Sequence, residues 1–182
     1  MIEREQGRGQ VRFAARARMI LPPTAEVLFR ELGLGLVLVE DEQVVPTANH
    51  YISASVALTA DILSGALRLK MPRSTVDELR RRVPSTPEDW VAELCNQIAG
   101  RFGNRLSKRG VSLRFQPPVM ADENDAKGEH VPPDQRWVFR SGANTAVLEL
   151  EFRVSDNFDF VAPGVEPSMA EGQLVFFGDD DA

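Results

Sequence analysis

The feature that most constrains this chain is a long amphipathic helix predicted over residues 87–109. Thr86 is placed to cap its beginning, with Pro87 in the first turn, and Gly110 comes after two cations at its end. At about 100° per residue, the apolar side chains gather into one stripe. The stripe consists of Val91, Leu94, Cys95, Ile98, Phe102 and Leu106. It must pack on a core, which also predicts that the Cys95 thiol is buried and is not a nucleophile.

The opposite side of this helix has an unusual composition. Asparagine is a poor residue in the middle of a helix, and Gly100 and Gly103 each cost about 1 kcal/mol relative to alanine. Glu93 and Asn96 are one turn apart and therefore neighbours. A carboxylate and an amide beside a glycine, which has no side chain, indicate a surface that another molecule approaches closely. The alternative is that the glycines admit a neighbouring element and the polar residues face water. The outward set is Glu93, Asn96, Gln97, Gly100 and Asn104.

The remaining elements predict an α+β fold. Alternating apolar residues over 51–58 and 63–71 predict a hairpin, and residues 137–140 and 145–154 predict another. A short helix is expected over 25–32, ended by Gly33, a strand over 34–39, and a helix capped by Ser74. A strand is also expected over 111–115. In the last strand, Leu148 alternates with an outward Glu149. The order predicts a single domain of helices packed on a largely antiparallel sheet.

Composition and the chain ends restrict the class of protein. Twenty-one Lys and Arg against 27 Asp and Glu give a net charge of −6, which argues against a nucleic-acid binder. No apolar stretch approaches a membrane span, and the single cysteine forms no internal disulfide, so a cytoplasmic location is expected. We expect a flexible N-terminal arm over 1–21, the domain over 22–162, and an acidic tail over 163–182 that contains an apolar cluster at 174–177.

Other catalytic constellations are weak. His50 and His130 are far apart in the sequence with no cysteine near either, so no metal site is predicted. No serine, cysteine or lysine has the context of a nucleophile, and there is no phosphate-binding glycine loop.

The long helix and the segment after it resemble the signature of the CheC/CheX chemotaxis phosphatases. The family pattern is an aspartate or serine, a glutamate four residues on, an asparagine three further, and a proline after the next strand. Asp89, Glu93, Asn96 and Pro118 fill these positions. The resemblance covers residues 22–155, and the single motif is more similar to CheX than to CheC. Gln97 departs from the pattern, because an apolar residue or methionine is expected there.

The resemblance implies a protein aspartyl-phosphate phosphatase of two-component signalling, whose partner is a phosphorylated CheY-type receiver domain. In this interpretation Asn96 positions the attacking water and Glu93 pairs with a cation of the receiver. Asp89, Gln97, Gly100 and Asn104 would form the docking surface around them. No cofactor is implied on this chain, because a divalent metal such as magnesium belongs to the receiver.

The resemblance also implies a homodimer. Strands over 145–154 and 50–58 are candidates for the open sheet edge that a second copy would pair with. The rival hypothesis is that the apolar cluster at 174–177 folds over that edge.

Two alternative functions stay open. One is a non-catalytic CheX-like module that binds a receiver in a two-component or chemotaxis complex, since one fold hosts many roles. The other is an unrelated α+β protein with a chance motif. Retention of both Glu93 and Asn96 favours catalysis.

Overall fold

The computed structural model describes residues 7–39, 50–80, 84–120 and 135–155. In these ranges the chain forms one α+β domain, as the sequence predicts. No helix in the described ranges is long and apolar enough to cross a membrane. The elements are α1 (Arg8–Glu31), β1 (Val37–Val39), β2 (Tyr51–Ala60), β3 (Leu63–Pro72), α2 (Arg73–Leu79), α3 (Pro87–Ser107), β4 (Arg114–Phe115), β5 (Val119–Met120), β6 (Arg136–Ser141) and β7 (Asn144–Val154).

All strands of the described chain belong to one antiparallel sheet. Its order is β1-β6-β7-β3-β2-β4, and β5 pairs with β2 beside β4. The β2–β3 hairpin pairs Ala60 with Leu63, so a two-residue turn connects the strands. The β6–β7 hairpin pairs Ser141 with Asn144 in the same way, with Gly142 at a φ of 59°. Both predicted hairpins are confirmed.

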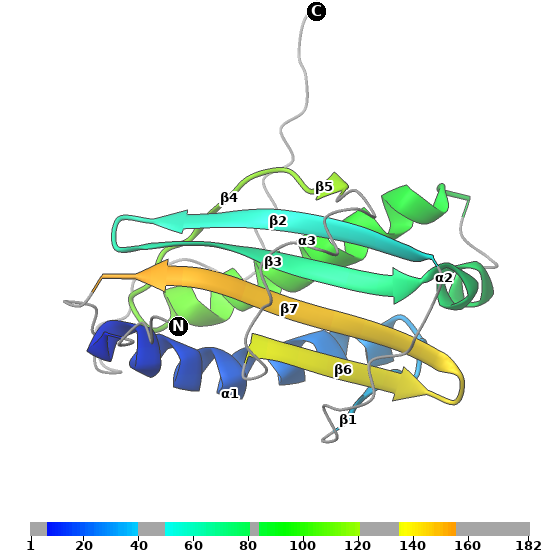
Figure 1. Ribbon diagram of the computed structural model, residues 1–182, viewed down its shortest axis with the longest axis horizontal. Helices are drawn as coiled ribbons and strands as arrows, with labels where there is room; N and C mark the ends of the chain where they lie inside the picture. Colours follow the sequence, from blue (N-terminus) through cyan, green and yellow to red (C-terminus); the bar gives the residue numbers. More distant parts are fainter. Residues whose placement is uncertain (1–6, 40–49, 81–83, 121–134, 156–182) are drawn as a thin grey trace, which may run out of the picture.

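The two long helices lie side by side on one face of the sheet (Figure 1). α3 packs across β2 and β3, and α1 packs next to it over the β6–β7 side. Two edge-to-face aromatic contacts fix α1 on the sheet, Phe13 with Phe152 and Phe29 with Phe139, with ring centroids 4.6 and 5.3 Å apart. The core therefore lies between the sheet and this single helical layer, and the outer side of α3 faces away from it.

The predicted flexible arm and the predicted helix start at Ala25 are wrong for the described part of the N-terminus. α1 begins at Arg8 and continues through Pro22 and Pro23, with Phe13 fully buried. Apolar residues at helical spacing hold it on the sheet despite the surrounding arginines. The prolines have no N–H to donate to the carbonyls of Arg18 and Met19, and both of these residues are exposed.

Three local predictions are also corrected. α2 begins directly after Pro72, and Ser74 lies inside the helix rather than capping it. The strand predicted over 34–39 is regular only at Val37–Val39. The strand predicted over 111–115 is reduced to Arg114–Phe115, because Val111 is buried and its N–H donates to the Leu106 carbonyl at the end of α3.

The edge predicted for dimerisation is partly wrong. β7 lies between β6 and β3, so residues 145–154 cannot pair with a second copy. β2 is next to the edge, and among the described residues the two-residue strands β4 and β5 pair with its outer side. The apolar cluster at 174–177 and the acidic tail lie outside the described residues.

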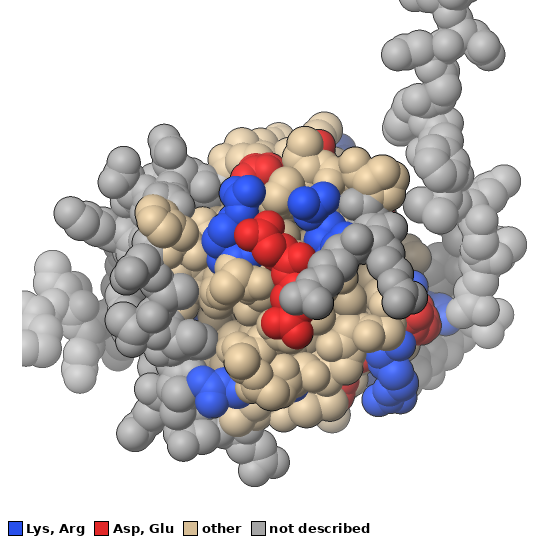
Figure 2. Space-filling view, turned by 90° about the vertical axis from the view of Figure 1, so that its right-hand side faces the viewer, with Lys and Arg blue, Asp and Glu red and all other residues tan. Residues whose placement is uncertain are grey.

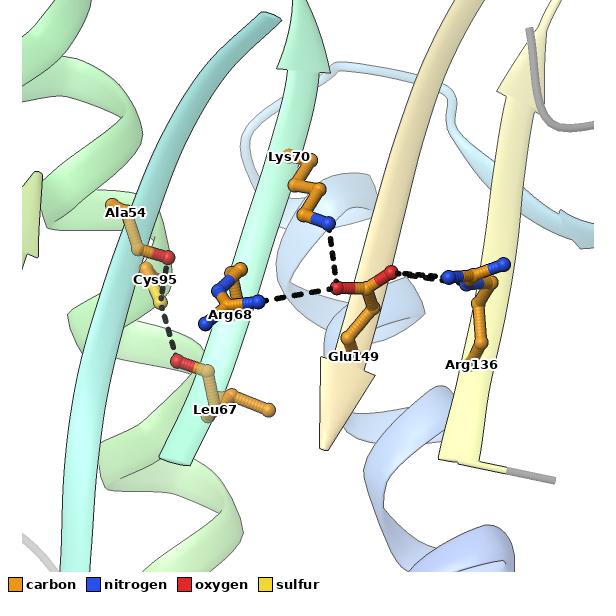
Figure 3. A network of polar contacts seen from close by, with 7 residues as sticks. All are labelled: Ala54, Leu67, Arg68, Lys70, Cys95, Arg136 and Glu149. Carbon is orange, nitrogen blue, oxygen red and sulfur yellow. Dashed lines mark hydrogen bonds and ion pairs between the residues drawn. The ribbon is translucent and has the colours of Figure 1, made fainter. Parts of the chain in front are cut away.

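Glu149 faces away from the helices, as predicted, yet it is buried rather than solvated, with 3% of its surface exposed. Its carboxylate lies among three cations from neighbouring strands (Figure 3). Lys70 Nζ is 2.8 Å from Oε2, and Arg136 Nη2 is 2.9 Å from Oε1. Arg68 Nη1 is 3.8 Å from Oε2. This network cross-links β3, β7 and β6 on the face opposite the helices.

The close contact between β3 and β7 at Gly65 gives a stability prediction. A Cβ at this position would overlap the backbone carbonyl of Glu151 and lie 2.9 Å from the Cα of Phe152. We expect Gly65→Ala to lower the free energy of unfolding by about 2 kcal/mol, because backbone atoms must move. Gly100→Ala is the matched control: its Cβ meets nothing within 4 Å, and it should stabilise by up to about 1 kcal/mol. Urea denaturation measures both, and equal stability of the two variants would contradict the prediction.

Candidate functional site

The candidate site is the outward face of α3, and the helix ends are well defined. The Thr86 hydroxyl accepts the Asp89 N–H at 3.1 Å and donates to the Asp89 carboxylate at 2.6 Å, which satisfies the first turn. The buried residues of α3 are the predicted apolar stripe together with Trp90, Ala99 and Gly103, which lie at its margins. α3 is thereby fixed in rotation, so its polar residues must point outward.

The predicted site residues lie together on this face. Glu93, Asn96, Asn104 and Asp89 are exposed, and Gln97 is half-buried between them. The Gln97 Nε2 donates to Glu93 Oε1 at 2.7 Å, which holds the carboxylate at one oxygen. The Asn96 side chain is exposed, so its amide can offer a donor and an acceptor to another molecule. The Asp89 carboxylate is engaged by the helix cap as well as being exposed.

The two glycines of α3 have different roles. A Cβ on Gly100 would meet nothing within 4 Å, so the surface beside Asn96 is bare. A Cβ on Gly103 would overlap the ring of Phe115 in β4, which lies directly against the helix backbone. The packing explanation therefore holds for Gly103, whereas no described residue accounts for Gly100.

Ion pairs border the site on the sides that face the other helices. Arg101 is 2.6 Å from Glu31 at the end of α1, and this hydrogen bond lowers the pKa of Glu31. Arg73 of α2 is 2.9 Å from Glu88 and 3.4 Å from Asp77. Figure 2 looks at the end of the molecule where α2 and the first turn of α3 lie, and it shows acidic and basic side chains adjacent to one another.

Cys95 takes no part in this surface, as predicted. Its side chain is fully buried, and its Sγ lies 3.5 Å from the Ala54 carbonyl and 3.6 Å from the Leu67 carbonyl, between β2 and β3 (Figure 3). Burial raises the pKa of the thiol to about 12. The described residues also contain no cluster of three or more His, Cys, Asp or Glu side chains that could hold a metal ion.

The arrangement suits positioning rather than covalent chemistry. An exposed amide can orient a water molecule, and a neighbouring carboxylate can bind a cation of another molecule. Helical spacing groups these residues on one face in the sequence, and the resemblance to the CheC/CheX signature singles out Glu93 and Asn96 as a candidate site. Sequence reasoning did not identify the side chains of β4 and β5 next to the face, because their position depends on the sheet. The signal for them was the apolar Phe115 and Met120 on either side of two prolines.

The fold of this chain matches solved structures of chemotaxis proteins, although no protein-family model and no curated protein matches its sequence. A chain of the CheX–CheY–BeF₃–Mg²⁺ complex from Borrelia burgdorferi is 14% identical with a TM-score of 0.57, covering 77% of this chain and 97% of that one.

Two further structures agree. CheX from Vibrio vulnificus is 16% identical with a TM-score of 0.56, covering 74% of this chain and 96% of its own. A CheC-like superfamily protein from Shewanella sp. PV-4 is 18% identical with a TM-score of 0.56, covering 77% of this chain and 97% of its own. This chain therefore has the CheC/CheX-like fold that its sequence predicted.

The buried thiol gives a reactivity prediction. With a pKa of about 12, on the order of one thiol in ten thousand is ionised at pH 8, and the core also excludes the reagent. We expect Cys95 in the folded protein to react with iodoacetamide at least about 100-fold more slowly than in guanidinium chloride, followed by mass spectrometry. Equal rates in the two states would contradict the burial of Cys95.

Proposed function

We propose that this chain is a CheX-like phosphatase that docks on the phosphorylated receiver domain of a response regulator, of the CheY type, and speeds hydrolysis of its aspartyl phosphate. The observation that supports this most is the pair of exposed residues, Glu93 and Asn96, beside the bare surface at Gly100. They lie on a fold shared with CheX, which has been solved in a complex with CheY, BeF₃ and Mg²⁺.

The proposed role of Asn96 is to place the attacking water. The water oxygen attacks phosphorus, the bond between phosphorus and the carboxyl oxygen breaks, and inorganic phosphate leaves while the receiver's aspartate is regenerated. An acyl phosphate is intrinsically labile, so holding the water in line supplies most of what is needed. The exposed amide of Asn96 can accept from the water and donate to it without changing its own charge.

The proposed role of Glu93 is to fix the register of docking. Gln97 occupies Oε1 of its carboxylate, which leaves Oε2 for a cation of the receiver. The receiver supplies a divalent metal such as magnesium, and the proposal needs no cofactor on this chain. A homodimer and a cytoplasmic location stay predictions of the resemblance.

The alternative is a non-catalytic module of the same fold that binds a receiver through the same face. It requires the docking surface but gives Asn96 no chemical task. Timing the loss of phosphate from phosphorylated receivers of the source organism, with and without this protein, separates the two functions.

The first functional prediction concerns Asn96→Ala. We expect dephosphorylation of the receiver to slow at least about tenfold, because the water is no longer oriented, while the thermal midpoint stays unchanged, because the side chain is exposed. Glu151→Ala, an exposed change on the opposite face of the sheet, is the control and should keep full activity. An Asn96→Ala protein with the activity of the wild type would rule out the phosphatase mechanism and leave the binding module.

A second functional prediction concerns Gly100→Leu. The Cβ of a residue at this position meets no described atom within 4 Å, and leucine is a better helix former than glycine, so the protein should be at least as stable as the wild type. Its side chain should prevent close approach of the receiver and weaken binding at least about tenfold. Calorimetry with a receiver activated by BeF₃ and Mg²⁺ measures the affinity. Gly100→Ala, which adds a smaller side chain, should weaken binding less than Gly100→Leu. Unchanged affinity of the leucine variant would place the docking face elsewhere.

A further inference from the structure

Two exposed apolar side chains flank the polar face of α3 on its β4–β5 side. Phe115 is 36% exposed and Met120 is 39% exposed. Both point to the helix side of the sheet, because they pair with the inward residues Leu58 and Ala54 of β2. We call these two residues the apolar shoulder. Val119, which is 65% exposed, pairs with Ser55 and therefore points to the opposite side.

The shoulder runs along α3 at the level of the candidate site. Cys95 contacts the carbonyl of Ala54, which is the residue opposite Met120, so Met120 lies level with the turn that carries Asn96. Phe115 lies against Gly103, two turns further along the helix. Asn96 and Gly103 are seven residues apart and so project on nearly the same side of α3. In Figure 1, β5 lies beside the first half of α3 and β4 beside the second.

The polar face is too small to be a complete docking surface. From Asp89 to Asn104 the helix advances about 22 Å, and with a width of about 10 Å it offers about 220 Å². A specific interface buries about 800 Å² on each partner and has an apolar centre in which aromatic residues and methionine are enriched. On one side of α3 the Arg101–Glu31 ion pair borders the face. On the other side the surface continues into the apolar shoulder.

We propose that the apolar shoulder is the second half of the docking surface and binds apolar side chains of the receiver next to its phosphorylated aspartate. The inference rests on the proposed function, because it takes the partner of the α3 face to be that receiver. It assigns the two halves different tasks. Asn96 acts on the transition state, whereas Phe115 and Met120 contribute contacts that are equal before and during the reaction, and such contacts lower KM without raising kcat.

The test compares Met120→Ser with Val119→Ser, two neighbouring positions on opposite sides of one short strand. We expect Met120→Ser to raise the Kd for a receiver activated by BeF₃ and Mg²⁺ at least about fivefold, and Phe115→Ala at least about tenfold. Val119→Ser should change the Kd less than about twofold although Val119 is more exposed. In dephosphorylation assays the two shoulder variants should raise KM and keep kcat, the opposite of Asn96→Ala.

Several results would overturn the inference. Unchanged affinity of both shoulder variants, or equal weakening by Val119→Ser, would remove the shoulder from the docking surface while the activity test of Asn96 still stands. A wild-type protein that neither binds nor dephosphorylates a receiver would remove the proposed function and the inference together. Sedimentation that shows a changed oligomeric state with no change in receiver binding would assign the shoulder to contacts between copies. Phe115→Ala also removes packing on Gly103 and could destabilise the fold. If the Phe115→Ala protein unfolds, the binding result of Met120→Ser alone decides the test.

Discussion

The burial of the apolar stripe of α3 on the β2–β3 hairpin is the contact on which the candidate site depends. Val91, Ile98 and Leu106 have no exposed surface, and the Cys95 thiol sits between backbone carbonyls of the two strands. A helix held at so many points cannot rotate about its own axis. Glu93 and Asn96 consequently keep a fixed outward direction, which is what a residue that orients water requires.

The two faces of the sheet are stabilised in different ways. Both long helices cover one face, so the other face has to be stabilised without a helix from the described chain. There the Glu149 carboxylate is shared by cations of β3 and β6, and the ion pairs join three strands across the sheet. Such a network adds rigidity to the middle of the sheet, against which α3 is packed.

Local pattern was sufficient for α3 and both hairpins, because their periodicity and end signals lie within a few residues of one another. It failed for α1, where arginines and two prolines outweighed the spacing of Phe13, Ala17 and Leu21. Those residues are helical because the sheet covers them, which is a tertiary effect. It also failed for Glu149 and for the place of β7 in the sheet, since strand order and ion pairing join residues distant in sequence.

The residues of the candidate site could be grouped from the sequence, whereas the apolar shoulder could not. A helix face is defined by sequence spacing, so Glu93, Asn96 and Gly100 can be grouped before any fold is known. Phe115 and Met120 reach the same face only because β4 and β5 pair with β2 and Gly103 leaves room for a ring. In the proposed function, the chemistry would therefore belong to α3, whereas the affinity would also depend on β4 and β5 beside it. If the proposal holds, the helix residues can stay constant while substitutions in β4 and β5 change the affinity for the receiver.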